Sequence, residues 1–251
     1  MTIRETIHAQ WKAMKDRPFK EKLSFFWDYY GIKTICILIA VAVFISFVVS
    51  IATQKDSAYF GVFFGATSKA SSSAFLEQFS DMAQIDTKTY DITIQTTLDV
   101  RMDQQITTET LEAMQSFAAM VAASMVDNFA ADKDLFLYYC YLGYTTDLRT
   151  VFTPEQLEAL AAHLHYVDGE LLQEQENAEE GLTFDYGQCP DSKKPELMQD
   201  PIPVGIDISA ATEAFLESYS FASEETVIGI CAGSARQDIA TLFLQFAFGL
   251  K

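Results

Sequence analysis

The hydrophobic and polar positions of the chain follow two different patterns. Residues 34–53, TICILIAVAVFISFVVSIAT, form an apolar run without a charged side chain. After residue 56, short apolar or alternating runs take turns with stretches whose apolar residues recur every three to four positions. The first pattern is typical of a transmembrane helix, and the second of strands and amphipathic helices. We therefore expect a transmembrane helix over 32–54 and an α/β domain with a mixed sheet over 55–251.

The first half of this domain alternates between strand and helix patterns. AYFGVFFG (58–65) is a short apolar run closed by Gly, and YDITIQTTLDV (90–100) alternates as a half-buried strand does. Two amphipathic helices are predicted in this half. The first begins at Ser72 or Ser73 and has the apolar stripe Phe75, Phe79 and Met82. The second begins at Thr107 or Thr108 and has the apolar stripe Leu111, Met114, Phe117, Val121 and Met125. This order predicts a partly parallel sheet with helical crossovers.

The second half continues with further strands and helices. TPEQLEALAAHL has a capping-box start, LHYVDGELL predicts a hairpin that turns at Asp168-Gly169, and a long acidic loop is expected near 172–200. IPVGIDIS (202–209) and TVIGICAG (226–233) have strand character. A helix containing Phe215, Leu216 and Tyr219 lies between them, and RQDIATLFLQFAFG predicts a closing helix.

Two acidic residues after VDNFAA (126–131) could serve in catalysis or metal binding, or could form the turn between a strand and a helix. VDNFAA predicts a third strand, and Asp132 stands where the N-cap of the next helix belongs, with Asp134 in the first turn. Gly143 stands where a left-handed residue ends that helix. Turn and cap therefore account for both carboxylates, and catalysis or metal binding by them is the weaker interpretation.

Charge is divided unevenly along the chain. Residues 1–33 hold seven basic and four acidic side chains; of the totals of 17 and 35, residues 34–251 keep ten basic and 31 acidic ones. The excess of acidic side chains in residues 34–251 would repel phosphate groups, which excludes nucleic acid as a partner of this part of the chain. The positive-inside rule predicts a cytoplasmic N-terminus and an extracytoplasmic domain, held in the cell membrane by an uncleaved single-pass signal anchor. A signal peptide cleaved after Ser50-Ile51-Ala52 is the alternative.

The basic head and the cysteines leave further alternatives open. Aromatic residues such as Trp11 and Trp27 within residues 1–31 predict an interfacial helix on the lipid bilayer, or else a docking segment for a cytoplasmic partner. Of the three cysteines after the apolar run, Cys231 has the setting of a small buried residue. Cys140 and Cys189 are the candidates for a disulfide.

No catalytic constellation can be assembled from the sequence, so we expect neither an enzyme nor a cofactor. A G-x-S-x-G motif is lacking. His163 and His165 would share a face of a strand, but two ligands without a third make a poor zinc site, and no metal is expected. AGSARQD places Ser234 ahead of a helix start, where backbone amides can bind an anion, although turn chemistry is the simpler interpretation.

Three segments resemble the extracytoplasmic solute-binding proteins of ABC importers, which have the type II periplasmic-binding fold. They are VDNFAADKDLFLYYCYLGYTTDLRTVF, with Gly143 and Asp147-Leu148 in a G-x-x-x-DL step, IPVGIDIS, and TVIGICAGSARQDIATLFLQF. The resemblance implies that the last strand is followed by a helix that rebuilds the first lobe. The domain is shorter than two full lobes and follows a transmembrane helix instead of a lipid anchor, so the resemblance implies a reduced lobe.

These observations predict a bacterial membrane-anchored recognition domain that binds a small ligand or serves a membrane complex. The alternative is a structural or assembly protein without a small-molecule ligand, which contacts membrane-protein partners. In the first case a concave pocket should be lined by aromatic residues, and in the second a broad apolar patch should be exposed. The candidate ligand-binding residues are Tyr59, Phe64, Tyr144 and Ser234.

Overall fold

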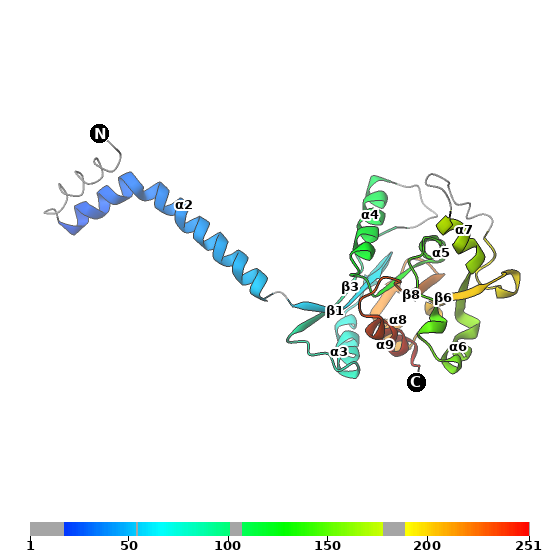
Figure 1. Cartoon of the computed structure of the whole chain (residues 1–251). Helices are drawn as coiled ribbons and strands as arrows, with labels where there is room; N and C mark the ends of the chain where they lie inside the picture. The colour runs from blue at the N-terminus through cyan, green and yellow to red at the C-terminus, as the bar shows by residue number, and fades with distance from the viewer. Residues whose placement is uncertain (1–17, 54, 101–106, 178–188, 251) are drawn as a thin grey trace. The chain divides into compact units, whose positions relative to one another are not determined.

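The computed structural model describes residues 18–53, 55–100, 107–177 and 189–250 (Figure 1). The chain divides into two compact units, Met1–Gln54 and Lys55–Lys251. The expected interfacial helix and the middle of the expected acidic loop lie partly outside the described residues. The ends of that loop are described: its first residues belong to helix α7 (Gly169–Asn177), and residues 195–197 form a short 3₁₀ helix, η4 (Pro195–Leu197).

The described part of the first unit is one helix, α2 (Phe19–Thr53). It begins well before the expected transmembrane boundary at residue 32. Large apolar side chains between 32 and 47 are exposed, among them Ile32 (81%) and Phe44 (67%). Of the helices within the described residues, none combines the length and the apolar character needed to cross a membrane.

The second unit is built on a six-stranded mixed sheet in the order β3-β1-β4-β8-β6-β5. The strands are β1 (Asp56–Phe63), β3 (Tyr90–Gln95), β4 (Asn128–Asp132), β5 (Leu164–Asp168), β6 (Pro201–Asp207) and β8 (Thr226–Ile230). Strand β1 is parallel to β3 and β4, as the alternation of strands and helices predicts. Strand β8 enters antiparallel between β4 and β6, and β5 is antiparallel to β6. Strand β8, which comes last in the sequence, therefore joins the β3-β1-β4 half of the sheet to the β6-β5 half.

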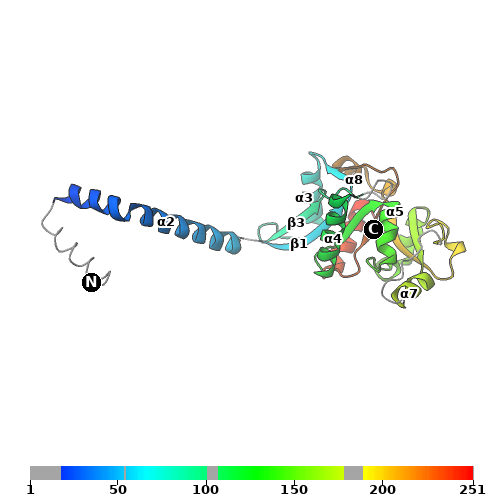
Figure 2. The same ribbon diagram turned by 90° about the horizontal axis from the view of Figure 1, so that it is seen from above.

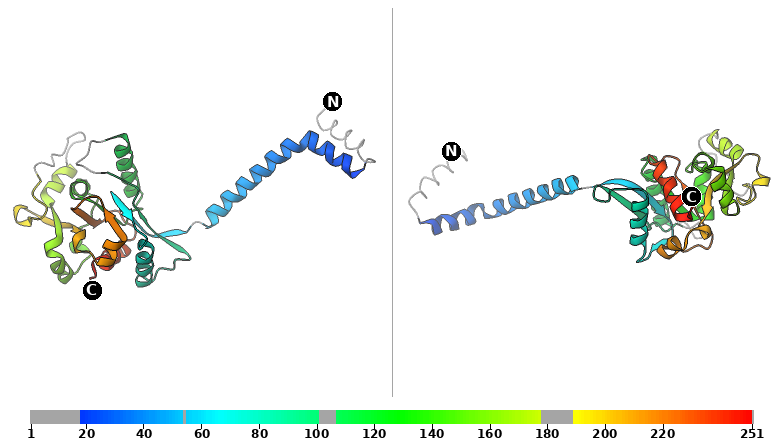
Figure 3. Two further views of the ribbon diagram at one scale, coloured as in Figure 1. Left: turned by 180° about the vertical axis from the view of Figure 1, so that it is seen from behind. Right: turned by 90° about the horizontal axis from the view of Figure 1, so that it is seen from below.

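Helices cover both faces of this sheet. Helices α4 (Thr108–Ala122), α5 (Lys133–Tyr141) and α7 pack on one face, in front of the sheet in Figure 2. Helices α3 (Ser72–Met82), α6 (Pro154–Leu160), α8 (Glu213–Ser218) and α9 (Gln237–Phe248) pack on the other, and the red α9 faces the viewer in the right panel of Figure 3. Alternate residues of β1 serve the two cores, because successive strand side chains point to opposite faces.

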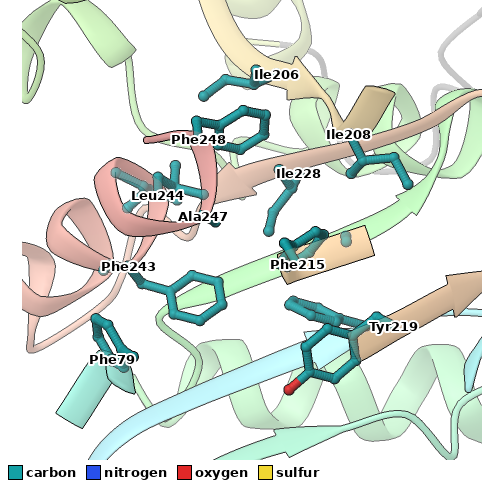
Figure 4. Close-up of a cluster of buried hydrophobic side chains, with 14 of the residues drawn as sticks. Phe79, Ile206, Ile208, Phe215, Tyr219, Ile228, Phe243, Leu244, Ala247 and Phe248 are labelled. Atoms are coloured by element: carbon teal, nitrogen blue, oxygen red, sulfur yellow. The ribbon is translucent and has the colours of Figure 1, made fainter. Parts of the chain in front are cut away.

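The core under α9 is rich in aromatic side chains (Figure 4). Phe243 of α9 stacks on Tyr59 with ring centroids 4.5 Å apart and meets Phe79 of α3 edge-on at 5.2 Å. Phe215 and Tyr219 join the same cluster from α8 and from β7 (Tyr219–Phe221), which forms a small second sheet with β2 (Ala66–Ser68). Such ring pairs add about 0.5–1.5 kcal/mol each beyond area burial. The C-terminal helix thus completes the core around the first strand.

On the opposite face, two glycines let α5 approach the sheet closely. Gly205 and Gly229 lie side by side on β6 and β8, and the ring of Phe136 covers both. A Cβ atom at Gly205 would lie 2.5 Å from a ring carbon of Phe136, and one at Gly229 would lie 2.7 Å from the carbonyl oxygen of Val204. The missing side chains therefore fix the distance between helix and sheet.

Several expected elements are confirmed with their local chemistry. Thr153 and Gln156 form the predicted capping box with Pro154 in the first turn of α6. Asp132 caps α5, and Gly143 has the left-handed φ of +77° that the end of this helix requires. In each case a side chain or a glycine fixes the backbone locally, so a few neighbouring residues suffice to predict it.

The predicted hairpin at Asp168-Gly169 is wrong. Helix α7 begins at Gly169, and β5 pairs with β6 instead of with the residues that follow it. The carboxylate of Asp168 accepts hydrogen bonds from the backbone N–H groups of Glu170, Gln199 and Asp200. These bonds hold the chain in a helix start, and the partners at 199 and 200 are too distant in sequence to anticipate.

Three predicted periodicities extend too far. Strand β3 ends at Gln95, and Leu98 and Val100 pack in the core on the other face from Ile92 and Ile94. Of the two predicted helix stripes, Phe75, Phe79 and Phe117 are buried, whereas Met82, Leu111 and Met125 are more than 40% exposed. Both helices lie at the edge of the domain, so only part of each apolar stripe packs against the sheet. Tyr219 belongs to strand β7 and not to α8.

We expect Gly229→Ala to lower the free energy of unfolding by about 1–3 kcal/mol, because its Cβ atom would overlap Val204 O and the Phe136 ring. Gly233→Ala is the matched control, since a Cβ atom there meets its nearest neighbour at an ordinary 3.5 Å. Urea unfolding of residues 55–251 measures both. Equal losses in the two variants would contradict the close approach of α5.

Candidate functional site

A buried carboxylate, Asp127, lies immediately before β4 and is fully shielded from solvent. Its Oδ2 accepts the backbone N–H of Phe60 at 2.8 Å and the Nε–H of Arg236 at 3.0 Å, and its Oδ1 accepts the hydroxyl of Ser234 at 2.6 Å. Arg236 also donates through Nη2 to the carbonyl oxygen of Met125 at 2.7 Å. We call these residues, Phe60, Met125, Asp127, Ser234 and Arg236, the Asp127 network.

The Asp127 network explains the AGSARQD segment as structure. The Ser234 hydroxyl donates a hydrogen bond to Asp127. The hydroxyl oxygen of Ser234 also accepts a hydrogen bond from the backbone N–H of Arg236, the N-cap residue of α9. Both functions of the hydroxyl are therefore used inside the protein. The network ties the loop after β8 to the start of β4 and the middle of β1, which is a mechanical role.

The four predicted ligand-binding residues do not share a site. Tyr59 and Phe64 are 0% and 2% exposed and lie in the two different cores, on opposite faces of the sheet. Tyr144 is half-buried, stacks on Tyr139 with ring centroids 5.5 Å apart, and accepts at its carbonyl from the N–H of Ala232. Phe64 and Tyr144 belong to the same core, where both rings contact Phe117 and Tyr139, and Ser234 lies in the loop after β8. The aromatic residues chosen from sequence chiefly build the core.

A second polar group lies at the opposite end of β4 and β8. Here β4 and β6 end, β8 and β5 begin, and α5 starts. The group, which we call the ionic edge, consists of Lys133, His165, Ser192, Lys193, Asp207 and Glu225. The Nζ of Lys193 lies 2.8 Å from Oδ2 of Asp207, and Lys133 is paired with Glu225. Ligands of open α/β sheets bind at the carboxyl ends of strands, so this is the favoured position for a binding site.

His165 is the most deeply buried member of the ionic edge, at 1% exposure. Its side chain is on β5, its Nδ1 lies 2.8 Å from the hydroxyl oxygen of Ser192, and its Nε2 is buried without a hydrogen-bond partner. Burial, followed by the positive charge of Lys193, lowers the pKa of His165 to about 4. The imidazole is therefore neutral at pH 7. The proposed pairing of His163 with His165 is not found, since His163 lies in the 3₁₀ helix η2 (Ala161–His163) ahead of β5.

The carboxylate of Asp207 is held ionised at the same edge. Burial alone would raise its pKa, but the ion pair with Lys193 and the N–H of Ser209 outweigh burial and lower the pKa to about 2. In the closed state Asp207 therefore carries a negative charge beside the Lys193 ammonium group at neutral and mildly acidic pH. Sequence reasoning passed over Lys193 and Asp207, whose only signals were a Lys-Lys pair in an acidic stretch and an Asp at a strand end.

Within the described ranges, no group of three or more His, Cys, Asp or Glu side chains is placed to hold a metal ion. None of Cys140, Cys189 and Cys231 is in a disulfide, so the candidate pair Cys140–Cys189 is not bridged in this structure. Burial raises the pKa of Cys231 to about 12. Asp132 and Asp134 act as cap and first-turn acid of α5, with the Asp132 carboxylate accepting from the N–H of Leu135.

Comparison with known proteins identifies no relative: the sequence matches no protein-family model and no curated protein, and the fold matches no solved structure.

We expect Arg236→Met to lower the free energy of unfolding by about 3 kcal/mol, because it leaves the buried Asp127 carboxylate without its positive partner. Arg149→Met is the matched control: Arg149 pairs with Asp147 at a site where its side chain is 47% exposed, and such pairs contribute less than about 1 kcal/mol. Denaturant unfolding compares the two. A loss at Arg236 no larger than at Arg149 would show that the network is dispensable.

Proposed function

We propose that the protein is a membrane-anchored recognition module whose extracytoplasmic α/β domain binds a small polar ligand at the ionic edge. The observation that carries the proposal is the convergence of charges of both signs on the carboxyl ends of β4 and β6. A polar ligand can exchange its own charged groups for one partner of each ion pair there. Recognition is favoured over catalysis, because the hydroxyl of Ser192 and the imidazole of His165, which lie 2.8 Å apart at this edge, are both buried away from a substrate.

The anchor in this proposal is the apolar part of α2. Its support is the uncharged run at 34–53 and the exposure of large apolar side chains along that part of the helix. Exposed apolar side chains around a whole helix are stable only in an apolar environment. The basic head then stays in the cytoplasm by the positive-inside rule, and the domain from residue 55 onward lies outside.

The resemblance to solute-binding proteins supports the same proposal. It implies a closing strand and helix that return to the first lobe of the domain. In this chain α9 packs on β1 through the Phe243–Tyr59 stack, and β8 lies between β4 and β6. We propose a reduced single lobe of this kind as the recognition domain.

Ligand binding should raise the melting temperature of residues 55–251 by about 5–10 °C at a hundredfold excess over the dissociation constant. A thermal-shift screen with pools of amino acids, sugars, peptides and polyamines measures it. Lys193→Met should abolish the shift by removing one charge of the ionic edge. Lys88→Met, at an exposed site beyond this edge, should retain it. No shift of the melting temperature in any pool would contradict ligand recognition by this domain.

The full chain should stay with membranes after alkaline carbonate extraction, and a protease added to intact cells should remove the domain after residue 55. A chain that starts at residue 55 is the matched control and should be found in the carbonate supernatant. Full-length protein in that supernatant, or protection of the domain in intact cells, would contradict the anchor or its orientation.

The assembly function is the second candidate, and the exposed face of α4 favours it. Leu111 is 49% exposed in this helix and Met125 is 48% exposed just after it, with Phe117 the one fully buried residue of α4. A photo-reactive residue at position 111 should then cross-link to another membrane protein in cells, with position 88 as the control. Equal labelling at both positions would count against assembly through α4.

A further inference from the structure

The segment Cys189–Asp200, which we call the strap, lies beside the edge strand β5. It is joined to this strand at two points, one near each end. The backbone N–H of Tyr166 donates to Ser192 O at 2.8 Å, and the hydroxyl of Ser192 meets Nδ1 of His165. Asp168, three residues further along β5, accepts the N–H groups of Gln199 and Asp200. Both ties are polar.

The strap has little apolar attachment to the domain. Of residues 189–200, Ser192 and Met198 are the buried ones, and Leu197 is 61% exposed. Segments with few buried apolar contacts open locally at a small fraction of the global unfolding free energy. The stability of the strap therefore depends on its polar contacts, which are those of Ser192 with β5, of Gln199 and Asp200 with Asp168, and of Lys193 with Asp207.

The geometry around His165 points to an acid-sensitive latch: we propose that protonation of the His165 imidazole releases the Ser192 end of the strap from β5. An imidazolium ion at this position would carry a buried Nε2–H with no acceptor, and it would lie beside the Lys193 ammonium group. Buried donors without a partner and buried like charges both cost free energy. Opening the strap exposes the ring to water and removes both costs.

Charged groups reach His165 from each element around it. Lys193 of the strap and Lys133 at the start of α5 oppose protonation, whereas Asp207 at the end of β6 and Glu225 ahead of β8 favour it. Burial is the strongest influence, and together these effects lower the pKa of His165 to about 4 in the closed state. In the opened strap the exposed ring regains a pKa near 6.5. The open state thus binds more protons, so acid favours opening.

Two carboxylates that hold the strap, those of Asp207 and Asp168, have lowered pKa values in the closed state. The pKa of Asp207 is lowered to about 2, and three backbone N–H groups lower the pKa of Asp168 despite its burial. Lowered pKa values keep these two carboxylates ionised while the strap is closed, and His165 is the group whose pKa rises toward 6.5 when the strap opens. One proton taken up on opening raises the opening equilibrium constant by up to tenfold per pH unit, and by about 40-fold between pH 6 and pH 4. The latch requires no ligand and is independent of the recognition function.

Hydrogen exchange of the full-length protein in detergent micelles, followed by mass spectrometry from pH 7.5 to pH 4.5, tests the latch. After correction for intrinsic exchange rates, protection of Tyr166 and of strap amides should fall about sevenfold per pH unit below pH 6. Amides of β8 in the same sample should keep their protection. Loss of β8 protection in parallel with the strap, or protection independent of pH, would overturn the proposal.

Two variants and one titration complete the test. His165→Gln should abolish the pH dependence, whereas His163→Gln, which changes the neighbouring half-exposed histidine, should leave it as in the wild type. A pH dependence that survives His165→Gln would refute the latch. If that variant does not fold, the histidine NMR titration of the wild type decides: a pKa far below 6.5 for one of the three histidines supports the latch, and three ordinary pKa values contradict it.

Discussion

The domain depends on one buried carboxylate. Asp127 accepts hydrogen bonds from β1, from the loop after β8 and from the residue that caps α9, although these groups are far apart in the sequence. A buried carboxylate that loses a donor costs several kcal/mol, so the three donors together favour the arrangement that brings these segments to one point. Because β8 lies between β4 and β6, the same interaction holds the loop after the strand that links the two halves of the sheet.

The ionic edge at the other end of β8 has a different character. Its side chains are paired, yet several remain partly exposed, and one of them, His165, retains a buried nitrogen without a partner. At one end of the strand the polar groups are all occupied inside the protein, whereas at the other end they are available for exchange with a ligand or with protons. Because of this contrast, we interpret the Asp127 network as structural and the ionic edge as the candidate functional site.

Sequence patterns predicted the elements of the fold better than the site. The alternation of strands and helices, the cap at Asp132 and the left-handed Gly143 depend on residues close in sequence, and all three are confirmed. The failures involve distant partners: Asp168 is held by the backbone at 199 and 200, and Ser234 donates to Asp127, 107 positions away. Tyr59 and Phe64 were chosen as site residues because aromatic side chains line pockets, but on a strand covered on both faces they fill the core.

A double-mutant cycle between Asp127→Asn and Arg236→Met tests the dependence on Asp127 most directly. The loss in unfolding free energy should be strongly non-additive, with a coupling of about 1.5–3 kcal/mol, because each change removes one half of a single buried interaction. Losses that add to within about 0.5 kcal/mol would mean that the carboxylate and the guanidinium group act separately. The closure of the sheet would then have to be attributed to its apolar cores alone.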